Sequence, residues 1–502
     1  MNILTPKNAL TLALALGLLT GCGEKFLEET PRDRVTTENF YQTEADAIQA
    51  TNAAYSQLGR GGQYNYALWG IGEIMSDNST TGGGGGGDGA EEIQLDFFNI
   101  PASNPMVNRL WAGCYVGIGA ANLVLDKVPG IPNMTESIRR RCLGEAKFLR
   151  AKYYFDLVRA FGEVPLLTVP PKSPAEAYAI PRTPVAQVYA LITQDLVDAI
   201  GSLPENYSGG DLGRATKWAA TGLLAKVHLT QGNMPFASQR AKEVIASGRF
   251  SLWADYGDNF KVTNENGKES LFEVQYVNGL NEYIFDGLGF VGNEFFAPRG
   301  QGLVPQGGYG FNVPEQEFVA GYQPGDRRRD VTIWKPGDAY PTGSATASHP
   351  AILPGSPNGY NCRKWFVGKT NTNVWDSPLN FPVLRLAEMY LIVAEADGAT
   401  GGATGGLEAV NKVRRRAFGL DVNAPSARDF TAATPNFTDA VQKERRYELA
   451  FEDDRWFDLK RSNKLLTNPA LLAKGIKPFN VVLPIPQSER DANPNLAQNP
   501  GY

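Results

Sequence analysis

Apolar and small residues recur at helical spacing through most of the chain, which predicts a protein built mainly of α-helices. The pattern from Thr43 to Leu58 starts with a threonine that can cap a helix. Two longer amphipathic patterns follow over residues 104–127 and 135–161, with Pro129 and Pro132 between them. Shorter helices are expected over residues 66–75, 185–203, 217–229, 235–247, 384–396 and 407–418.

The predicted helical hairpin over residues 217–247 carries small residues where its two helices would cross. Gly232 ends the first helix, and Ala237 and Ala241 recur in the second. The same pattern recurs over residues 384–418 and, less clearly, over residues 138–161. Hairpins of about 34 residues with small crossing residues are typical of tetratricopeptide units, whose backbones approach closely before the next pair stacks. We therefore expect a short tetratricopeptide-like helical-repeat scaffold.

A long segment of different character interrupts these helices from about residue 250 to residue 382. Residues 271–276 alternate like a strand, and beyond them glycine, proline, asparagine and aromatic residues dominate. We call this segment the insertion. The prediction is a mainly α-helical scaffold over about 40–250 and 383–502, with a loop-rich insertion over about 250–382 and few short strands.

The first residues have the pattern of an export signal. Lys7 precedes an apolar run from Ala9 to Leu19, which is too short to span a bilayer, and the order Leu-Thr-Gly-Cys ends at Cys22. This is the pattern that a lipoprotein signal peptidase reads. Residues 1–21 are therefore predicted to be a signal peptide, and residues 22–502 the mature domain, held to a membrane by acyl chains on Cys22. The alternative is an ordinary secretory signal whose cysteine is accidental.

Charge and composition narrow the possible functions. The formal net charge of −5 over 502 residues argues against electrostatic binding of nucleic acid. The arginine runs at 139–141, 327–329 and 414–416 are expected on solvated helix faces or loops. With only two histidines, histidine-rich zinc sites and most histidine-based catalysis are disfavoured, and His228 is expected to be packed. Cys114, Cys142 and Cys362 could include one Cys114–Cys142 pair or remain buried free thiols.

No cofactor-binding motif occurs together with the neighbouring elements that it requires. Residues 287–292 match G-x-G-x-x-G, but neither helical periodicity nor a cap follows them, so we interpret them as a loop. The glycine run 82–87 lacks the Lys-Ser/Thr end of a phosphate-binding loop. The carboxylate-rich segment 444–458 places acidic and basic residues three and four apart, which favours a structural salt-bridge lattice over a glycosidase carboxylate pair. We expect no cofactor and no metal.

The aromatic residues of the insertion are the candidate binding residues. Sugar rings stack their C–H faces on flat aromatic side chains, while amides and charged groups satisfy the surrounding hydroxyls. Core packing is the competing explanation for any single aromatic residue, so a binding site requires several of them to converge.

Several segments along nearly the full chain resemble the SusD/RagB family of Bacteroidetes outer-membrane lipoproteins. These are Phe26-Leu27-Glu28 to Pro31 with Phe40-Tyr41, the helix and exit over 143–166, Pro181 to Pro184, the strand entry over 264–276, Glu444-Arg445 with the run Arg455 to Arg461, and the ending Leu483 to Pro486 with 493–502.

The resemblance implies a tetratricopeptide-containing scaffold with a variable, loop-rich ligand face. It also implies a non-catalytic, cell-surface lipoprotein that captures oligosaccharides or polysaccharides and delivers them to a SusC-like TonB-dependent outer-membrane transporter. The cluster around Arg455 and Trp456 belongs to the scaffold. A binder of peptides or another non-sugar nutrient, a glycoside hydrolase, and a purely structural lipoprotein remain as alternatives.

In the family, the ligand face draws on the loop after the early helix, here about residues 77–104, and on the insertion. The first of these has glycines and Phe97-Phe98 but no tryptophan, which weakens the case for starch. The predicted ligand-binding residues are Trp334, Trp365 and Trp375 as stacking platforms, Tyr309 and Tyr340 beside them, and Asp77 and Asn78 as polar contacts.

Overall fold

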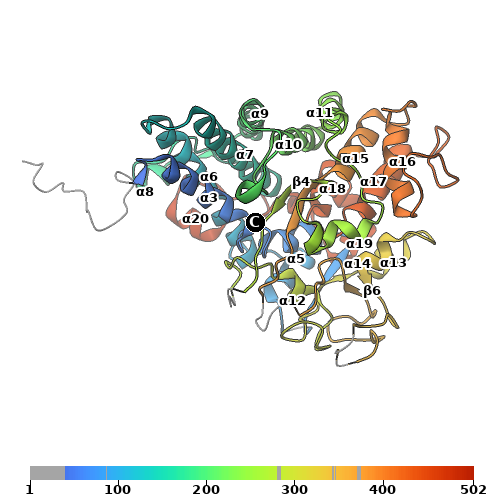
Figure 1. Ribbon diagram of the computed structural model, residues 1–502. Helices are drawn as coiled ribbons and strands as arrows, with labels where there is room; N and C mark the ends of the chain where they lie inside the picture. Colours follow the sequence, from blue (N-terminus) through green and yellow to red (C-terminus); the bar gives the residue numbers. More distant parts are fainter. Residues whose placement is uncertain (1–39, 86, 280–283, 342–343, 345, 370–374) are drawn as a thin grey trace, which may run out of the picture.

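The computed structural model describes residues 40–85, 87–279, 284–341, 344, 346–369 and 375–502, so Cys22 and the signal segment lie outside the described residues. The protein is mainly helical, with a layer of helices on one side and irregular chain on the other (Figure 1). The principal helices are α3 (Glu44–Ser56), α6 (Pro105–Lys127), α7 (Glu136–Phe161), α9 (Val185–Ser202), α10 (Lys217–Thr230), α11 (Met234–Ala246), α15 (Leu386–Asp397), α16 (Gly406–Ala417), α17 (Phe437–Glu448) and α18 (Arg455–Arg461).

The shorter elements lie between and after these helices. They are α4 (Ala67–Trp69), which continues into a π-helical turn (Gly70–Ile74), α5 (Ala90–Asp96), α8 (Pro174–Ala177), α12 (Gly292–Phe296), α13 (Gln316–Ala320), α14 (Arg328–Thr332), α19 (Pro469–Lys474) and α20 (Gln487–Ala492). The strands are β1 (Ser79–Gly82), β2 (Val164–Pro165), β3 (Arg182–Thr183), β4 (Ser270–Val274), β5 (Phe311–Pro314), β6 (Ile333–Trp334), β7 (Asn361–Cys362) and β8 (Phe381–Arg385).

Local capping explains where the first helices begin. The Thr43 side chain accepts a hydrogen bond from the Asp46 amide at 3.2 Å, and Asp46 accepts one in return from the Thr43 amide at 2.8 Å. Asn104 caps α6 by accepting hydrogen bonds from the amides of Met106 and Val107. Both predicted helix starts are confirmed to within one residue.

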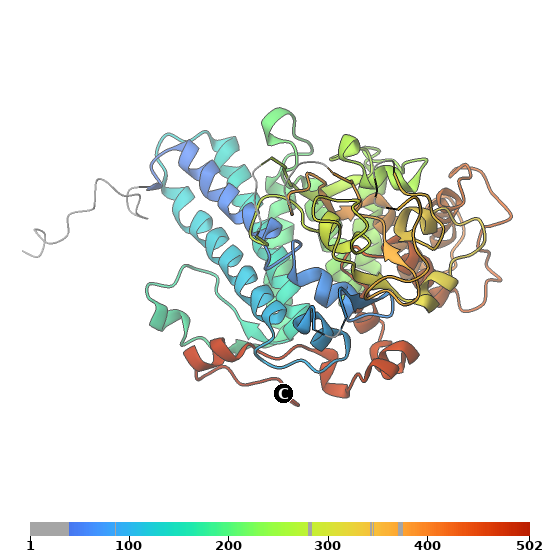
Figure 2. The same cartoon turned by 90° about the horizontal axis from the view of Figure 1, so that it is seen from below.

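Consecutive long helices pack against one another from α6 through α7, α9, α10, α11, α15 and α16, and Figure 2 shows α6 and α7 side by side. Small residues permit the close approach: a Cβ added to Gly117 of α6 would lie 2.3 Å from the Tyr153 ring of α7. The mainly helical fold class is confirmed.

Short antiparallel ladders tie the irregular chain to the helices. Within the described residues the pairs are β1–β5, β2–β3, β4–β8 and β6–β7. The predicted strand is β4, and it pairs with β8, which runs directly into α15. The β1–β5 ladder joins the loop after the early helices to the insertion, in the register Ser79↔Pro314.

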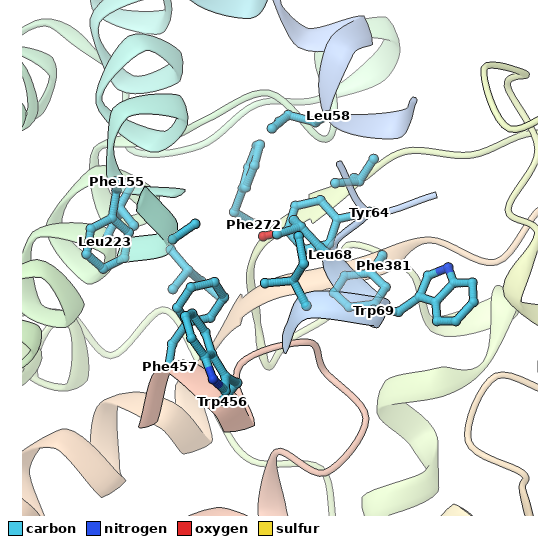
Figure 3. Packing of buried hydrophobic residues seen from close by; sticks show 14 of the residues in the cluster. Leu58, Tyr64, Leu68, Trp69, Phe155, Leu223, Phe272, Phe381, Trp456 and Phe457 are labelled. Atoms are coloured by element: carbon cyan, nitrogen blue, oxygen red, sulfur yellow. The ribbon is translucent and has the colours of Figure 1, made fainter. Parts of the chain in front are cut away.

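A large apolar core lies where the helices meet these ladders. Figure 3 shows Phe272 of β4 and Phe381 of β8 near Tyr64 and Leu68, with Trp456 and Phe457 of α18 below them. Trp456 is fully buried, which agrees with its assignment to the scaffold. Cys114, Cys142 and Cys362 are all free and buried, and the buried His228 ring lies against Phe236.

The arginine runs lie only in part on solvated surfaces as expected. Arg140 and Arg327 are exposed, but the run 414–416 is buried. Arg328 and Arg416 are each 1% exposed, and both contact the buried carboxylate of Glu448. Arg385 of β8 bonds the same carboxylate and also contacts Glu269, which in turn bonds Arg416. We call these five residues the Glu448 lattice. The sequence shows the helical spacing of these charged residues, but it does not show their burial, because that depends on partners far away in the sequence.

In the part of the chain that is described, no helix combines the length and the apolar composition needed to cross a membrane.

The substitution Glu448→Gln should destabilise the protein by about 3–5 kcal/mol, because it leaves three buried guanidinium groups without their shared carboxylate. Chemical denaturation measures this loss.

The stability of the protein should also depend on the ionisation of Glu448. Burial alone would raise the pKa of Glu448, but Arg416, Arg385 and Arg328 lower it to about 2. The stabilisation is therefore present above pH 4.5, the ordinary pKa, and is lost as the pH falls toward 2.

Asp439→Asn is the matched control, because Asp439 pairs with Lys464 at the surface, where its side chain is 63% exposed. Its removal should change stability by less than about 1 kcal/mol. Equal effects of the two substitutions would show that the Glu448 lattice does not hold the fold together.

Candidate functional site

Three partly exposed aromatic side chains come together on the loop-rich side of the molecule. The ring of Trp375 lies 4.8 Å from that of Phe285 and 6.4 Å from that of Tyr309, between centroids. The Trp375 indole nitrogen donates a hydrogen bond to the Tyr309 hydroxyl at 3.3 Å. We call Phe285, Tyr309 and Trp375 the aromatic cluster; it brings together two of the five aromatic residues that the sequence predicted.

Buried aromatic residues support the aromatic cluster from beneath. Phe295 of α12 lies 5.2 Å from Phe285, 5.1 Å from Tyr309 and 5.1 Å from Trp375. Tyr66, just before α4, lies 3.9 Å from Phe285. The Trp375 backbone has a φ of 59°, in the left-handed region that side chains other than glycine seldom adopt. The contacts of the Trp375 indole with Phe285 and Phe295 therefore stabilise a backbone conformation that this residue would avoid in an unsupported loop.

Two ion pairs flank the aromatic cluster. Arg109 of α6 lies 3.3 Å from Asp286 and stacks over Phe285, while Arg299 bonds Asp88 at 2.7 Å and the Tyr309 carbonyl at 3.0 Å. Each guanidinium is thus committed to a carboxylate of the protein itself.

A pair of carboxylates lies at the far end of Tyr66. Its hydroxyl oxygen lies 2.8 Å from a carboxylate oxygen of Glu91 and 2.8 Å from one of Glu92, both in α5. Burial and the neighbouring Glu91 raise the pKa of Glu92 to about 7. Near neutral pH the two glutamates therefore carry less charge than two free carboxylates, which suits a neutral ligand face.

Glu294 of α12 positions the loop that carries Tyr309. One of its carboxylate oxygens accepts hydrogen bonds from the amides of Gln306 and Gly308, at 3.0 and 3.1 Å. The Tyr309 amide donates to the Glu294 carbonyl at 3.0 Å. Burial raises the pKa of the Glu294 carboxyl to about 7.

Trp334 and Tyr340 do not face a ligand, contrary to the prediction. They form a small separate core with Leu303, in which Trp334 is 1% exposed. The Tyr340 hydroxyl contacts His349 Nδ1 at 2.5 Å, and Arg363 stacks on the Trp334 ring. These residues stabilise the outer loops of the insertion.

Trp365 is also a core residue rather than a stacking platform. It is 1% exposed, its ring stacks on Phe381 at 4.7 Å, and its indole nitrogen donates to the Phe451 carbonyl at 3.0 Å. Both faces and the polar edge are already occupied within the protein.

Asp77 and Asn78 are buried as well, and they act as clamps between distant parts of the chain. Asp77 makes a two-point contact with Arg455, at 2.7 and 2.9 Å. Burial opposes its charge, but Arg455 and Arg446 hold its pKa well below the usual range. Asn78 donates to Glu73 and accepts from Arg446. Neither side chain is available to a ligand.

Phe285 was not predicted from the sequence. Ile284 and Phe285 form an apolar pair immediately before Asp286-Gly287, a turn signal. An apolar pair beside a turn is the signal that could have identified it, because loops leave such residues at the surface.

The glycine-rich match at residues 287–292 differs in part from the expected loop, because Gly292 begins the five-residue α12. A Cβ added to Gly289 would lie 2.4 Å from the Asp376 backbone, so this glycine permits close packing of two loops. Among the described residues, no group of three histidine, cysteine, aspartate or glutamate side chains could hold a metal ion.

Comparison with known proteins agrees with the fold. A family profile described as "SusD family" matches residues 247–502, and one described as "Starch-binding associating with outer membrane" matches residues 25–229. The chain is 28% identical to "SusD-like protein P25" of Formosa agariphila, over 95% of this chain and 96% of that protein.

Solved structures are similar over nearly the whole chain. A "Laminarin binding SusD-like protein" superposes with a TM-score of 0.77 at 31% identity, covering 92% of this chain and 100% of that one. "Surface glycan-binding protein A" from Bacteroides fluxus superposes with a TM-score of 0.77 at 26% identity and the same coverage. With profiles over both halves and these full-length similarities, the chain belongs to the SusD family.

Proposed function

We propose that this protein captures neutral oligosaccharides at the aromatic cluster, without cleaving them, and delivers them to a SusC-like TonB-dependent outer-membrane transporter. The observation that carries the proposal is the convergence of Phe285, Tyr309 and Trp375, each partly exposed, over the buried Phe295. A sugar ring gains by covering such surface with its C–H face.

The surrounding charges favour a neutral ligand. A sulfated or uronic-acid glycan needs cations that can bind it, but Arg109 and Arg299 are held by Asp286 and Asp88. Hydroxyl groups of a neutral sugar can instead use the edges of these ion pairs.

The relatives support a glycan and suggest which one to test first. The structure at 31% identity is described as laminarin binding, and a second similar structure is described as glycan-binding. Laminarin, a neutral glucan, agrees with the charge arrangement at the aromatic cluster. It is therefore the first candidate ligand.

The proposed location is the cell surface at the outer membrane, with acyl chains on Cys22 as the anchor. One matching family is described as associating with the outer membrane. The Leu-Thr-Gly-Cys order ending at Cys22 supports the lipid anchor. A tethered receptor can hold its cargo beside a transporter in the same membrane.

Trp375→Ala and Tyr309→Ala should each weaken binding of laminarin roughly tenfold, which corresponds to about 1.4 kcal/mol of lost stacking. Affinity electrophoresis against a panel of polysaccharides, followed by calorimetry, measures the change. Trp334→Phe should leave binding intact, because Trp334 lies in the small outer core.

Tyr178→Ala is a matched control, since Tyr178 is 43% exposed and lies in the proline-rich segment at α8, outside the aromatic cluster. Retardation that survives both Trp375→Ala and Tyr309→Ala would rule out this site. New reducing ends in laminarin incubated with the protein would favour a hydrolase, and heat released by peptide pools but not glycans would favour a peptide binder.

Cys22→Ala should abolish incorporation of labelled fatty acid and move the protein out of the outer-membrane fraction, because the thiol is the proposed acylation site. Fractionation of cells with and without the substitution measures this. Cys362→Ala is the control, since that thiol is buried. Unchanged labelling in Cys22→Ala would disprove the anchor.

A further inference from the structure

A hollow of about 300 Å³ lies next to the aromatic cluster, on the far side of the segment 285–289. Its walls come from four parts of the chain: α3 with the residues after it, the loop around Leu212, β4 with the residues after it, and Gly287 with Leu288. We propose that this hollow is a second sugar-binding subsite, which receives the continuation of a neutral oligosaccharide held at the aromatic cluster. The inference rests on the proposed function.

The segment 285–289 forms a rigid ridge between the two sites. The Asn65 side-chain amide donates to the carbonyls of Phe285 and Gly289, at 3.0 Å each, and the Gly61 amide donates to the Asp286 carboxylate at 3.0 Å. The Val277 amide donates to the Leu288 carbonyl at 3.0 Å. The ridge is therefore fixed at both ends and in its middle.

The two sites are close enough for one ligand. Phe285 contacts Trp375 on one side of the ridge, while Gly287 and Leu288 line the hollow on the other. Three residues of chain span at most about 10 Å. A few linked sugars can cross that distance, and Leu288, which is 42% exposed, offers them apolar surface on the way.

The lining of the hollow has the composition that a sugar requires. The partly exposed ring of Tyr55 provides apolar surface, and the buried Phe272 ring supports it from 6.4 Å away, between centroids. Asn52 and Ser56 of α3 share a helix face with Tyr55 and line the hollow with an amide and a hydroxyl. Apolar surface rimmed by neutral polar groups suits a carbohydrate.

The charged groups that line the hollow already have hydrogen-bond or ion-pair partners within the protein. Arg214 donates to Asp211 at 2.6 Å and to Glu145 at 3.2 Å. Glu273 accepts hydrogen bonds from the Asn266 amide and from Asn380. As at the aromatic cluster, an anionic or cationic ligand would have to break contacts that the protein makes with itself, so both sites select the same neutral class.

One glycine shapes the wall of the hollow. Gly213 has a φ of +94°, and a Cβ at this position would lie 2.5 Å from the Gln275 side chain. The Gln275 amide is itself held in place by Asn266, through hydrogen bonds of 2.8 and 3.0 Å. The loop at Leu212 can therefore close against β4 and the residues after it, which makes the hollow a fixed feature of the surface.

The test compares laminarin oligosaccharides from the disaccharide to the heptasaccharide by calorimetry. For the wild-type protein, affinity should rise roughly tenfold once the chain is long enough to cross the ridge, which is the gain expected of one additional stacking contact. The double variant Asn52→Leu/Ser56→Leu should lose this gain while binding short oligosaccharides as the wild type does. Leucine narrows the hollow and removes its polar groups without adding a flat ring.

Gln49→Leu/Ala53→Leu is the matched control, because both residues are exposed on α3 at the same spacing and neither lines the hollow. It should keep the length dependence. If wild-type affinity does not rise with length, or if the rise survives in Asn52→Leu/Ser56→Leu, the subsite is wrong while binding that depends on Trp375 still supports the proposed function. If the wild type binds no oligosaccharide of the series, the proposed function and the subsite both fail.

Discussion

The structure depends on one buried carboxylate. Glu448, at the end of α17, receives arginines from three other elements: Arg328 of α14, Arg385 of β8 and Arg416 of α16. None of these groups has access to water, so each charge can remain only while the others are present. Because Arg328 belongs to the insertion and Arg416 to the helical scaffold, the Glu448 lattice locks the two together.

A second set of contacts attaches the segments near the ligand face to α17, α18 and the residues between them. Lys364 bonds Glu452 at 2.8 Å, and Trp365 bonds the Phe451 carbonyl, so the segment after α17 holds the last part of the insertion. Asp77 and Asn78 attach the early loop to α17 and α18 in the same way. Asp77, Asn78 and Trp365 were predicted to contact a ligand, but they instead hold together the structure that supports Tyr309 and Trp375.

Sequence reasoning succeeded where local periodicity decides the structure. The helix starts at Thr43 and Asn104 and the strand near Phe272 follow from capping and alternation, which act over a few residues. It could not separate Trp334 and Trp365 from Trp375, because all three occur in similar glycine- and proline-rich surroundings. Burial of the first two depends on partners such as Tyr340 and Phe381, which the fold alone brings together. Arg328 and the run 414–416 show the same limit: their charge favoured the surface, and only carboxylates distant in sequence explain their burial.

The pairing of β4 with β8 has a consequence for how the ligand face can change. Ser270 lies opposite Arg385 and Val274 opposite Phe381, so the chain leaves the scaffold and returns to it at neighbouring points. The roughly one hundred residues between these strands therefore begin and end at neighbouring positions, which the β4–β8 pairing holds at a constant separation. Loops of this segment that carry none of the buried contacts of Arg328, Lys364 and Trp365 can change in length or sequence without moving the helices, so one scaffold can acquire new specificities through changes in a single stretch of its gene.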